Sequence, residues 1–271
     1  MIEPISYLEA VKSLKPINLE NLSKKKISLL SSSSLIQLDI FIRGIFSKVG
    51  FDLSLQTLDF GTLKQFLLSG NNTFSSDQTI FLLFPWDFVE SLNWRTGYLC
   101  EKKCIQEYQN EIDYFVKLLS NKSLFRDPIF IYVDCPVPNI LRKASENKIL
   151  LEIIKIAAIN LSAKFVSSSF FSLSNFIFTG LPIQNKKIGD FAWLICKFLI
   201  DKNISKKIII IDLDNSLWDG VLGEDGLEGI KADQHEKGYF FFILQTFLKS
   251  LKNNGVLLAA VSKNDLDFIK E

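Results

Sequence analysis

Short runs of continuous apolar residues alternate along the chain with segments in which apolar residues recur every three or four positions. The continuous runs are typical of strands buried on both faces of a parallel sheet, and the longer period is typical of helices. This alternation predicts βαβ units and a parallel sheet. The predicted strands cover residues 27–30, 51–60, 79–84, 128–133, 208–211 and 255–261.

The helical spacing predicts helices over residues 35–49, 61–68, 105–119, 145–161, 188–199 and 240–251. A helical lead-in is expected within residues 1–25, with Tyr7, Leu8, Val11 and Leu14 on one side. Ser145 is a candidate cap for its helix. Residues 167–175 are rich in Ser and Phe without a clear period, which favours a loop. Residues 201–205 form the expected linker.

These elements predict two α/β domains. Residues 1–202 are expected to form a three-layer, flavodoxin-like parallel-sheet domain, and residues 203–271 the first part of a second, Rossmann-like α/β domain. The length of 271 residues and a hydrophobic content of 48% support substantial cores.

Charge and terminal composition narrow the class of protein. A formal net charge of +1 gives no electrostatic basis for nucleic acid or an anionic membrane as the main partner. The N-terminus lacks the apolar region of a signal peptide, and the longest apolar segments, 79–86 and 191–200, are too short to span a bilayer. We therefore expect a soluble, cytoplasmic protein.

The cysteine pattern does not indicate a zinc site. Cys100 and Cys104 are close in sequence on a predicted helix, Cys135 and Cys196 are isolated, and no C-x-x-C occurs. Without nearby His partners, reduced thiols are expected at all four positions.

Two carboxylates follow the run of four isoleucines at 208–211. Asp212 and Asp214 are spaced i, i+2 at the predicted carboxyl end of the strand, where open α/β sheets bind ligands. Like charges this close favour a cation, a proton or a phosphoryl group between them. An EF-hand loop is excluded because Leu217 and Gly223 occupy the positions that require Gly and Glu.

The apolar strand followed by Asp-Leu-Asp-Asn-Ser resembles motif I of the haloacid-dehalogenase (HAD) superfamily of phosphotransferases. The longer string DLDNSLWDGVLGEDGLEGI resembles the corresponding region of the FkbH-like proteins, HAD subfamily IIIC. The strand 255–261 and the Ser-Lys-Asn that follows it resemble motif II in the form associated with this subfamily. The segments FPWDFV at 84–89 and NWRTG at 93–97 resemble its N-terminal region.

The resemblance implies a site chemistry. Asp212 would be the nucleophile that forms an aspartyl-phosphate, and Asp214 would protonate the leaving oxygen and then activate water. Mg²⁺ would bind the carboxylate of Asp212 and the backbone carbonyl of Asp214, and Ser262 would donate a hydrogen bond to a phosphoryl oxygen. The other expected phosphate-binding residues are Lys263, Asn215 and Ser216. The segment 218–226 is expected to form a flap whose acidic residues are solvated. His235 is expected to be an exposed loop residue.

The implied function is that of a Mg²⁺-dependent phosphatase or phosphotransferase acting on a small phosphorylated metabolite. In characterised FkbH-like proteins this chemistry loads glycerate onto an acyl carrier protein, which makes such a carrier the expected partner. That activity is associated with a cysteine before the Ser-Lys-Asn triplet, and this chain has Val261 there. The thiol associated with glyceryl transfer is therefore absent from this position, whereas phosphoryl chemistry through Asp212 does not require it.

Two further expectations concern the limits of the chain and its first domain. Motifs III and IV of the HAD superfamily would follow residue 271. A HAD domain truncated within this chain would be inactive alone, and the full-length protein is expected to be an enzyme. The alternative is a non-catalytic binding or scaffold module with a HAD remnant. The first domain resembles the SGNH-hydrolase fold, but the chain's one histidine, His235, lies in the second domain. No imidazole is thus present to activate the serines at 31–34, and esterase activity is not expected.

Overall fold

A computed structural model describes residues 3–15, 22–70, 74–93, 95, 103–120, 125, 127–136, 143–200, 208–235 and 237–263. The chain divides into two compact units, Met1–Ile200 (unit 1) and Asp201–Glu271 (unit 2). The predicted linker at 201–205, along with Cys100, Trp94 and residues 96–97, lies outside the described residues.

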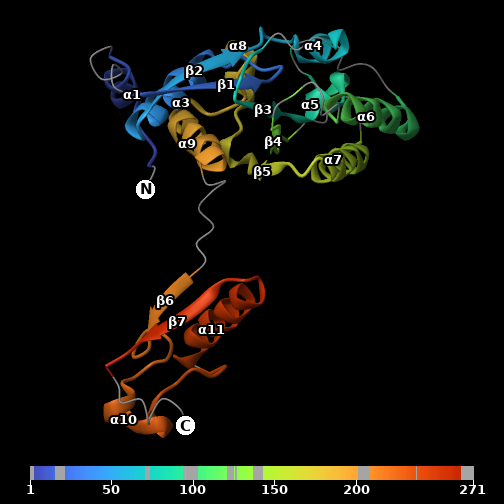
Figure 1. Ribbon diagram of the computed structural model, residues 1–271. Coiled ribbons are helices and arrows are strands. Elements are labelled where there is room, and N and C mark those ends of the chain that lie inside the picture. The colour runs from blue at the N-terminus through green and yellow to red at the C-terminus, as the bar shows by residue number, and fades with distance from the viewer. Residues whose placement is uncertain are drawn as a thin grey trace. The chain divides into compact units, whose positions relative to one another are not determined.

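Unit 1 contains a sheet of five parallel strands (Figure 1). The strands are β1 (Ser23–Leu30), β2 (Phe51–Thr57), β3 (Gln78–Leu83), β4 (Ile129–Val133) and β5 (Lys164–Val166). Their order is β2-β1-β3-β4-β5, the flavodoxin-like arrangement. The chain therefore reverses its direction of progress across the sheet after β2. The crevice between the carboxyl ends of β1 and β3 is the topological switch point of this fold.

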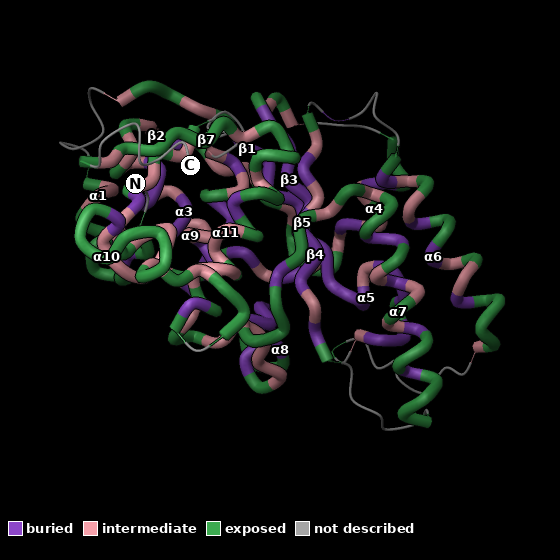
Figure 2. The backbone as a smooth tube through the Cα atoms, turned by 90° about the horizontal axis from the view of Figure 1, so that it is seen from below, coloured by how far each residue is buried: buried purple, intermediate pink, exposed green. Residues whose placement is uncertain are grey.

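Helices cover both faces of this sheet, as the views in Figures 1 and 2 show. One layer holds α1 (Tyr7–Ser13), α3 (Ile36–Lys48) and α9 (Ile188–Ile200). The other holds α4 (Leu63–Ser69), α5 (Pro85–Phe88), α6 (Ile105–Leu119) and α7 (Ala144–Asn160). Shorter elements are η1 (Glu90–Leu92), η3 (Ser168–Phe170), α8 (Leu173–Thr179) and η4 (Asn185–Lys187). The three-layer α/β class expected for this part of the chain is confirmed.

The apolar runs explain why this architecture forms. Every residue of β3 is buried, as expected for a central strand with helices on both faces. Aromatic side chains fill the adjoining core: Phe81 stacks on Phe130 at 5.2 Å between ring centroids and meets Phe125 edge-on at 4.9 Å. The hydrophobic core of unit 1 extends from Ile5 to Leu199 along the chain.

Several element predictions for unit 1 need correction. Strand β1 begins at Ser23 rather than at residue 27, because the lysine-rich half of the strand pairs in register with the start of β2. The predicted loop at 167–175 contains η3 and the start of α8, and β5 immediately precedes it. Helix α7 is capped at Lys143, so the expected cap at Ser145 is wrong.

Unit 2 contains two parallel strands, β6 (Ile208–Asp212) and β7 (Leu257–Val261), joined through α10 (Leu222–Gly229) and α11 (Gly238–Asn253). The predicted strands and the long helix are present, but their predicted burial is not. Ile210 is 66% exposed, every residue of β7 is exposed, and Phe240 on α11 is 72% exposed. A two-stranded sheet has too few neighbours to enclose these apolar side chains.

The expectations for membrane spans and for the cysteines can be compared with the described residues. No helix among them has the length and apolar character required to cross a membrane. Of the cysteines, Cys135 and Cys196 are buried free thiols whose pKa values burial raises, and Cys104 is an exposed free thiol just before α6. Buried thiols of raised pKa are unreactive at neutral pH.

Candidate functional site

The carboxyl edge of the sheet in unit 2 brings the two predicted motifs together. In the parallel register of β6 and β7, Asp212 lies opposite Val261, each as the last residue of its strand. Ser262 follows Val261 directly and therefore lies at the same edge as Asp212. Asp212 is exposed, and its Oδ1 accepts a hydrogen bond from the backbone N–H of Leu213 at 3.0 Å.

Asp214 lies in a more enclosed environment than Asp212. Its Oδ1 accepts hydrogen bonds from the indole Nε1 of Trp218 at 3.2 Å and from the backbone N–H of Leu222 at 3.0 Å. Leu213, between the two carboxylates, is buried and anchors the segment in unit 2. Two donors on one oxygen fix the orientation of the Asp214 carboxylate, and the sequence prediction did not identify either of them.

A short loop after Asp214 is closed by Asn215. This residue has a positive φ of 53°, a conformation that Asn tolerates better than most residues. Its backbone N–H donates to the carbonyl of Gly220 at 3.2 Å, and its Oδ1 accepts from the N–H of Gly220 at 3.1 Å. The side-chain oxygen of Asn215 is thus engaged in holding the loop, and phosphate binding by this residue stays a prediction.

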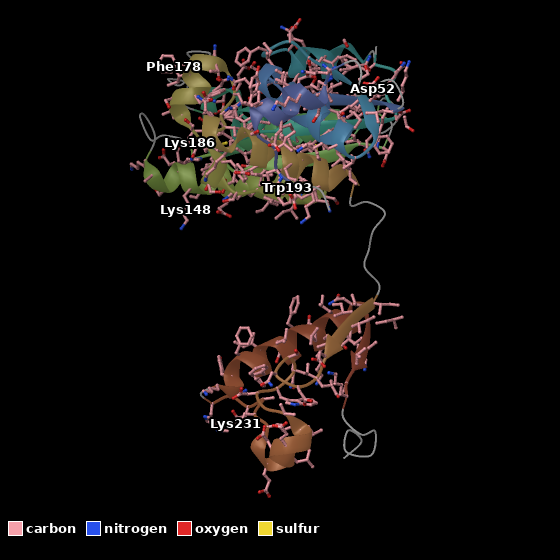
Figure 3. All side chains as sticks on the ribbon, turned by 90° about the vertical axis from the view of Figure 1, so that its left-hand side faces the viewer. Asp52, Lys148, Phe178, Lys186, Trp193 and Lys231 are labelled. Atoms are coloured by element: carbon pink, nitrogen blue, oxygen red, sulfur yellow. The ribbon has the colours of Figure 1, made fainter. Side chains whose placement is uncertain are left out.

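The predicted flap has more internal order than its sequence suggested. Asp219 and Lys231 exchange two backbone hydrogen bonds of 2.9 Å, and α10 lies between them (Lys231 is labelled in Figure 3). Asp225 was assigned as a solvated flap charge, but its Oδ2 accepts from the N–H of Val221 at 2.8 Å. Gln245 of α11 donates to the carbonyl of Leu217 at 2.8 Å and joins the residue just before the flap to the helix.

The remaining predicted residues flank the same edge. Ser216 is partly buried, and its backbone N–H donates to the carbonyl of Leu213 at 3.2 Å. Ser262 is partly buried and Lys263 is exposed. His235 is exposed, as expected for a loop residue.

The donor set at this edge suits a hard divalent cation. Asp212 offers a carboxylate oxygen and Asp214 a backbone carbonyl oxygen, and Mg²⁺ is typically held by one or two carboxylates together with water and substrate oxygens. The described residues contain no cluster of three or more His, Cys, Asp or Glu side chains that would form a closed protein cage.

Comparisons with known proteins give a structural relationship. Neither protein-family models nor curated proteins show a match to the sequence. The fold is similar to that of the N-terminal part of protein BF1531 from Bacteroides fragilis, which contains a phosphatase domain complexed with Mg. The TM-score is 0.73 and the identity 21%, over 98% of this chain and 76% of that one. The chain also matches an aryl esterase of M. smegmatis with a TM-score of 0.40 and 10% identity, over 66% of this chain and 100% of the esterase. The first similarity shows a shared fold, and the second is too distant to bear on function.

Proposed function

We propose that the protein is a Mg²⁺-dependent phosphatase or phosphotransferase of the HAD type, whose reaction takes place at the carboxyl edge of β6 and β7. The observation that carries the proposal is the register of this strand pair, which aligns Asp212 with Val261 and so brings Ser262 to the edge that holds the two carboxylates. The structural similarity to a fragment that contains a phosphatase domain complexed with Mg supports the same reaction class.

Asp212 is the proposed nucleophile. Its exposed carboxylate is accessible to a phosphoryl group, and attack on phosphorus forms an aspartyl-phosphate while the bond to the leaving oxygen breaks. Asp214 gives a proton to that oxygen and later takes one from the water that hydrolyses the aspartyl-phosphate. The N–H groups of Trp218 and Leu222 hold the Asp214 carboxylate in place for both transfers.

The carboxylate of Asp212 and the backbone carbonyl of Asp214 would hold Mg²⁺. When bound, the ion would neutralise charge on the phosphoryl oxygens. Ser262 would donate its hydroxyl proton to one phosphoryl oxygen, with Lys263, Asn215 and Ser216 as further proposed contacts. Backbone N–H groups of the turn after β6 would add donors to the same group.

The substrate class is a small phosphorylated metabolite, and the proposed partner is an acyl carrier protein. Val261 immediately precedes Ser262 and offers no thiol, so the residue at this position cannot carry an acyl thioester. An acyl group transferred to a carrier would therefore come from the substrate itself, because an aspartyl-phosphate carries only the phosphoryl group. A mass increase on a phosphopantetheinylated carrier protein, incubated with the enzyme and candidate substrates, would test this partner.

The proposed function is tested by release of inorganic phosphate from an aryl phosphate by the full gene product, with and without MgCl₂. Asp212→Asn removes the nucleophile and is expected to lower turnover by at least about a thousandfold, as loss of a catalytic nucleophile does. Asp219→Asn is the matched control, because it makes the same chemical change on the flap, where the contacts of residue 219 with Lys231 are made by the backbone.

A second measurement detects the chemistry independently of turnover. Phosphorylation by a small phosphoryl donor in MgCl₂, followed by peptide mass spectrometry, should add one phosphoryl group to the peptide containing Asp212. Turnover that survives Asp212→Asn would overturn the assignment. Mg²⁺-independent release of phosphate would do the same.

A further inference from the structure

A second candidate site lies in unit 1, at the switch point of its sheet. A cavity of about 90 Å³ is lined by residues that follow the ends of three adjacent strands. Ser32 follows β1, Phe60 and Gly61 follow β2, and Trp86 and Asp87 follow β3. Open α/β sheets bind ligands at this crevice, because the connections on its two sides leave in opposite directions.

Ser32 and Asp87 face each other across this switch point. The Ser32 hydroxyl donates a hydrogen bond to Oδ1 of Asp87, and Oδ2 accepts from the backbone N–H of Phe84 at 2.6 Å. The Asp87 residue is partly exposed, yet its carboxyl is enclosed, and desolvation raises its pKa to about 7. Because Ser32 gives its one proton to Asp87, its oxygen offers only lone pairs to a ligand.

The mouth of the cavity is also rich in acceptors. Glu90 lines it, and its Oε2 is 4.0 Å from Nζ of Lys64, which is equally 4.0 Å from Oε1 of Glu111. Nζ of Lys103 lies 3.2 Å from Oε2 of the same Glu111, so two lysines balance these two carboxylates at the rim. The carboxylate charge that these lysines leave unbalanced is that of Asp87 inside the cavity, whose lining also includes Lys64 and Asn93.

The apolar walls limit the shape of a ligand. Trp86 is stacked on Phe84 at 5.1 Å and on Phe176 at 4.4 Å and is buried, so little of its ring surface is available. The Arg95 guanidinium lies over the Phe60 ring at 4.7 Å. Because the rings of Trp86 and Phe60 already have these partners, we expect a ligand group to be held by the acceptors rather than by stacking.

We propose that this cavity binds a small ligand through a primary ammonium group. Such a group carries three donors and one positive charge, which matches Ser32, Asp87 and Glu90 as acceptors. A volume of about 90 Å³ corresponds to roughly three molecules of liquid water, so the enclosed part of the ligand is limited to a few atoms. The site is separate from the proposed phosphatase site and does not depend on it.

The hydrogen bonds around Ser32 favour recognition of a cation. The carbonyl of Ser32 accepts the N–H of Gly61 at 2.8 Å. The backbone amide of Gly61 is therefore engaged within the fold. Recognition of a cation, rather than attack by Ser32 on an ester, is what the contacts of this pair support.

Titration of the isotope-labelled full chain with ethylammonium chloride at pH 8, followed by amide NMR, tests the site. Saturable shifts are expected at residues 32, 61 and 87, with a Kd on the order of millimolar for three non-hydrogen atoms. Ethanol has the same heavy-atom count without charge and should give no saturable shift. Sodium chloride at equal concentration controls for ionic strength.

Variants make the result specific. Asp87→Asn should weaken ethylammonium binding at least tenfold, and Ser32→Ala should weaken it severalfold. Asp59→Asn removes a carboxylate that does not line the cavity and should bind like the wild type. Asp212→Asn should also bind normally, which separates this proposal from the phosphatase. Linear shifts equal to those in sodium chloride, or unchanged binding by a folded Asp87→Asn variant, would overturn the proposal.

Discussion

At the scale of single residues, the contacts of Asp214 yield a prediction about catalysis. Trp218→Phe removes the indole N–H that holds Oδ1 and keeps the aromatic ring. Loss of a group that orients a metal-site carboxylate typically lowers activity by about ten- to a hundredfold. We expect that loss in kcat, with KM little changed, measured by phosphate release. Trp193→Phe, on α9 of unit 1, is the matched control (Figure 3), and full activity of Trp218→Phe would show that the indole has no positioning role.

The enclosed carboxyl of Asp87 predicts a pH dependence of stability. Its pKa is 3.8 in an unfolded chain and about 7 in the fold, so the native state holds this proton more tightly. The free energy of unfolding should therefore fall as pH rises from about 4 to about 7, by at most about 4 kcal/mol at 1.4 kcal/mol per pKa unit. Partial exposure of the residue reduces that figure.

Asp87→Asn cannot titrate and should remove this part of the pH dependence. Urea unfolding of the two proteins between pH 4.5 and pH 8 measures the difference, because contributions of the other carboxyl groups cancel in the comparison. Parallel stability curves for the variant and the wild type would contradict the prediction.

Residues differ in how far the sequence predicts their role. Asp212 and Asp214 were identifiable because they interrupt an apolar run at a strand end, which is a local signal. Asp87 carries no such signal. It lies in the four-residue helix α5; its raised pKa arises from desolvation in the fold, and its hydrogen-bond partner Ser32 is 55 positions away in the chain. Contacts of that separation follow from strand order, which a single sequence does not specify.

At the scale of elements, the packing of α1 on α3 depends on a glycine. The sequence placed Tyr7, Leu8, Val11 and Leu14 on one side of the first helix, but the first three are exposed, and Ala10 is the buried residue. A Cβ added at Gly44 of α3 would lie 2.7 Å from Cα of Ala10. The close approach of two small residues, rather than a stripe of large ones, therefore joins these helices.

Gly44→Ala should consequently destabilise unit 1. Overpacking a tight contact costs about 1–3 kcal/mol, which outweighs the gain in helix propensity of about 1 kcal/mol from replacing Gly by Ala. The midpoint of urea unfolding measures the change. Gln37→Ala alters an exposed position of the same helix and should leave the midpoint almost unchanged. A stabilised Gly44→Ala variant would mean that the two helices separate at little cost.

Element boundaries were predictable where burial decides them. Strand β3 and helices α3, α6 and α9 follow their apolar patterns closely. Strand β5 has three residues, two of them exposed, and its lysine and phenylalanine form no run that marks a strand. It exists because it pairs with β4, from Ile131 opposite Lys164 to Val133 opposite Val166. Tertiary pairing of this kind overrides local propensity.

At the scale of the whole molecule, the two units differ in how much core each contains. All residues of the continuous hydrophobic core belong to unit 1. Among the described residues of unit 2, the buried hydrophobic side chains are Leu213, Leu222 and Leu248. Burial of apolar area is the main stabilising term in folding, so the stability of unit 1 should not require unit 2.

If unit 1 is stable by itself, the fragment 1–200 should unfold at the same urea concentration as unit 1 within the full chain. Phe81 is fully buried against Phe125 and Phe130, and Phe81→Ala should cost about 3–5 kcal/mol, as large-to-small changes of buried aromatic residues do. The loss should be equal in the fragment and in the full chain, because the partners of Phe81 all lie in unit 1. Near-ultraviolet circular dichroism during urea unfolding reports the aromatic core of unit 1. A fragment that unfolds at a clearly lower urea concentration than the full chain would instead show that unit 2 contributes to the stability of unit 1.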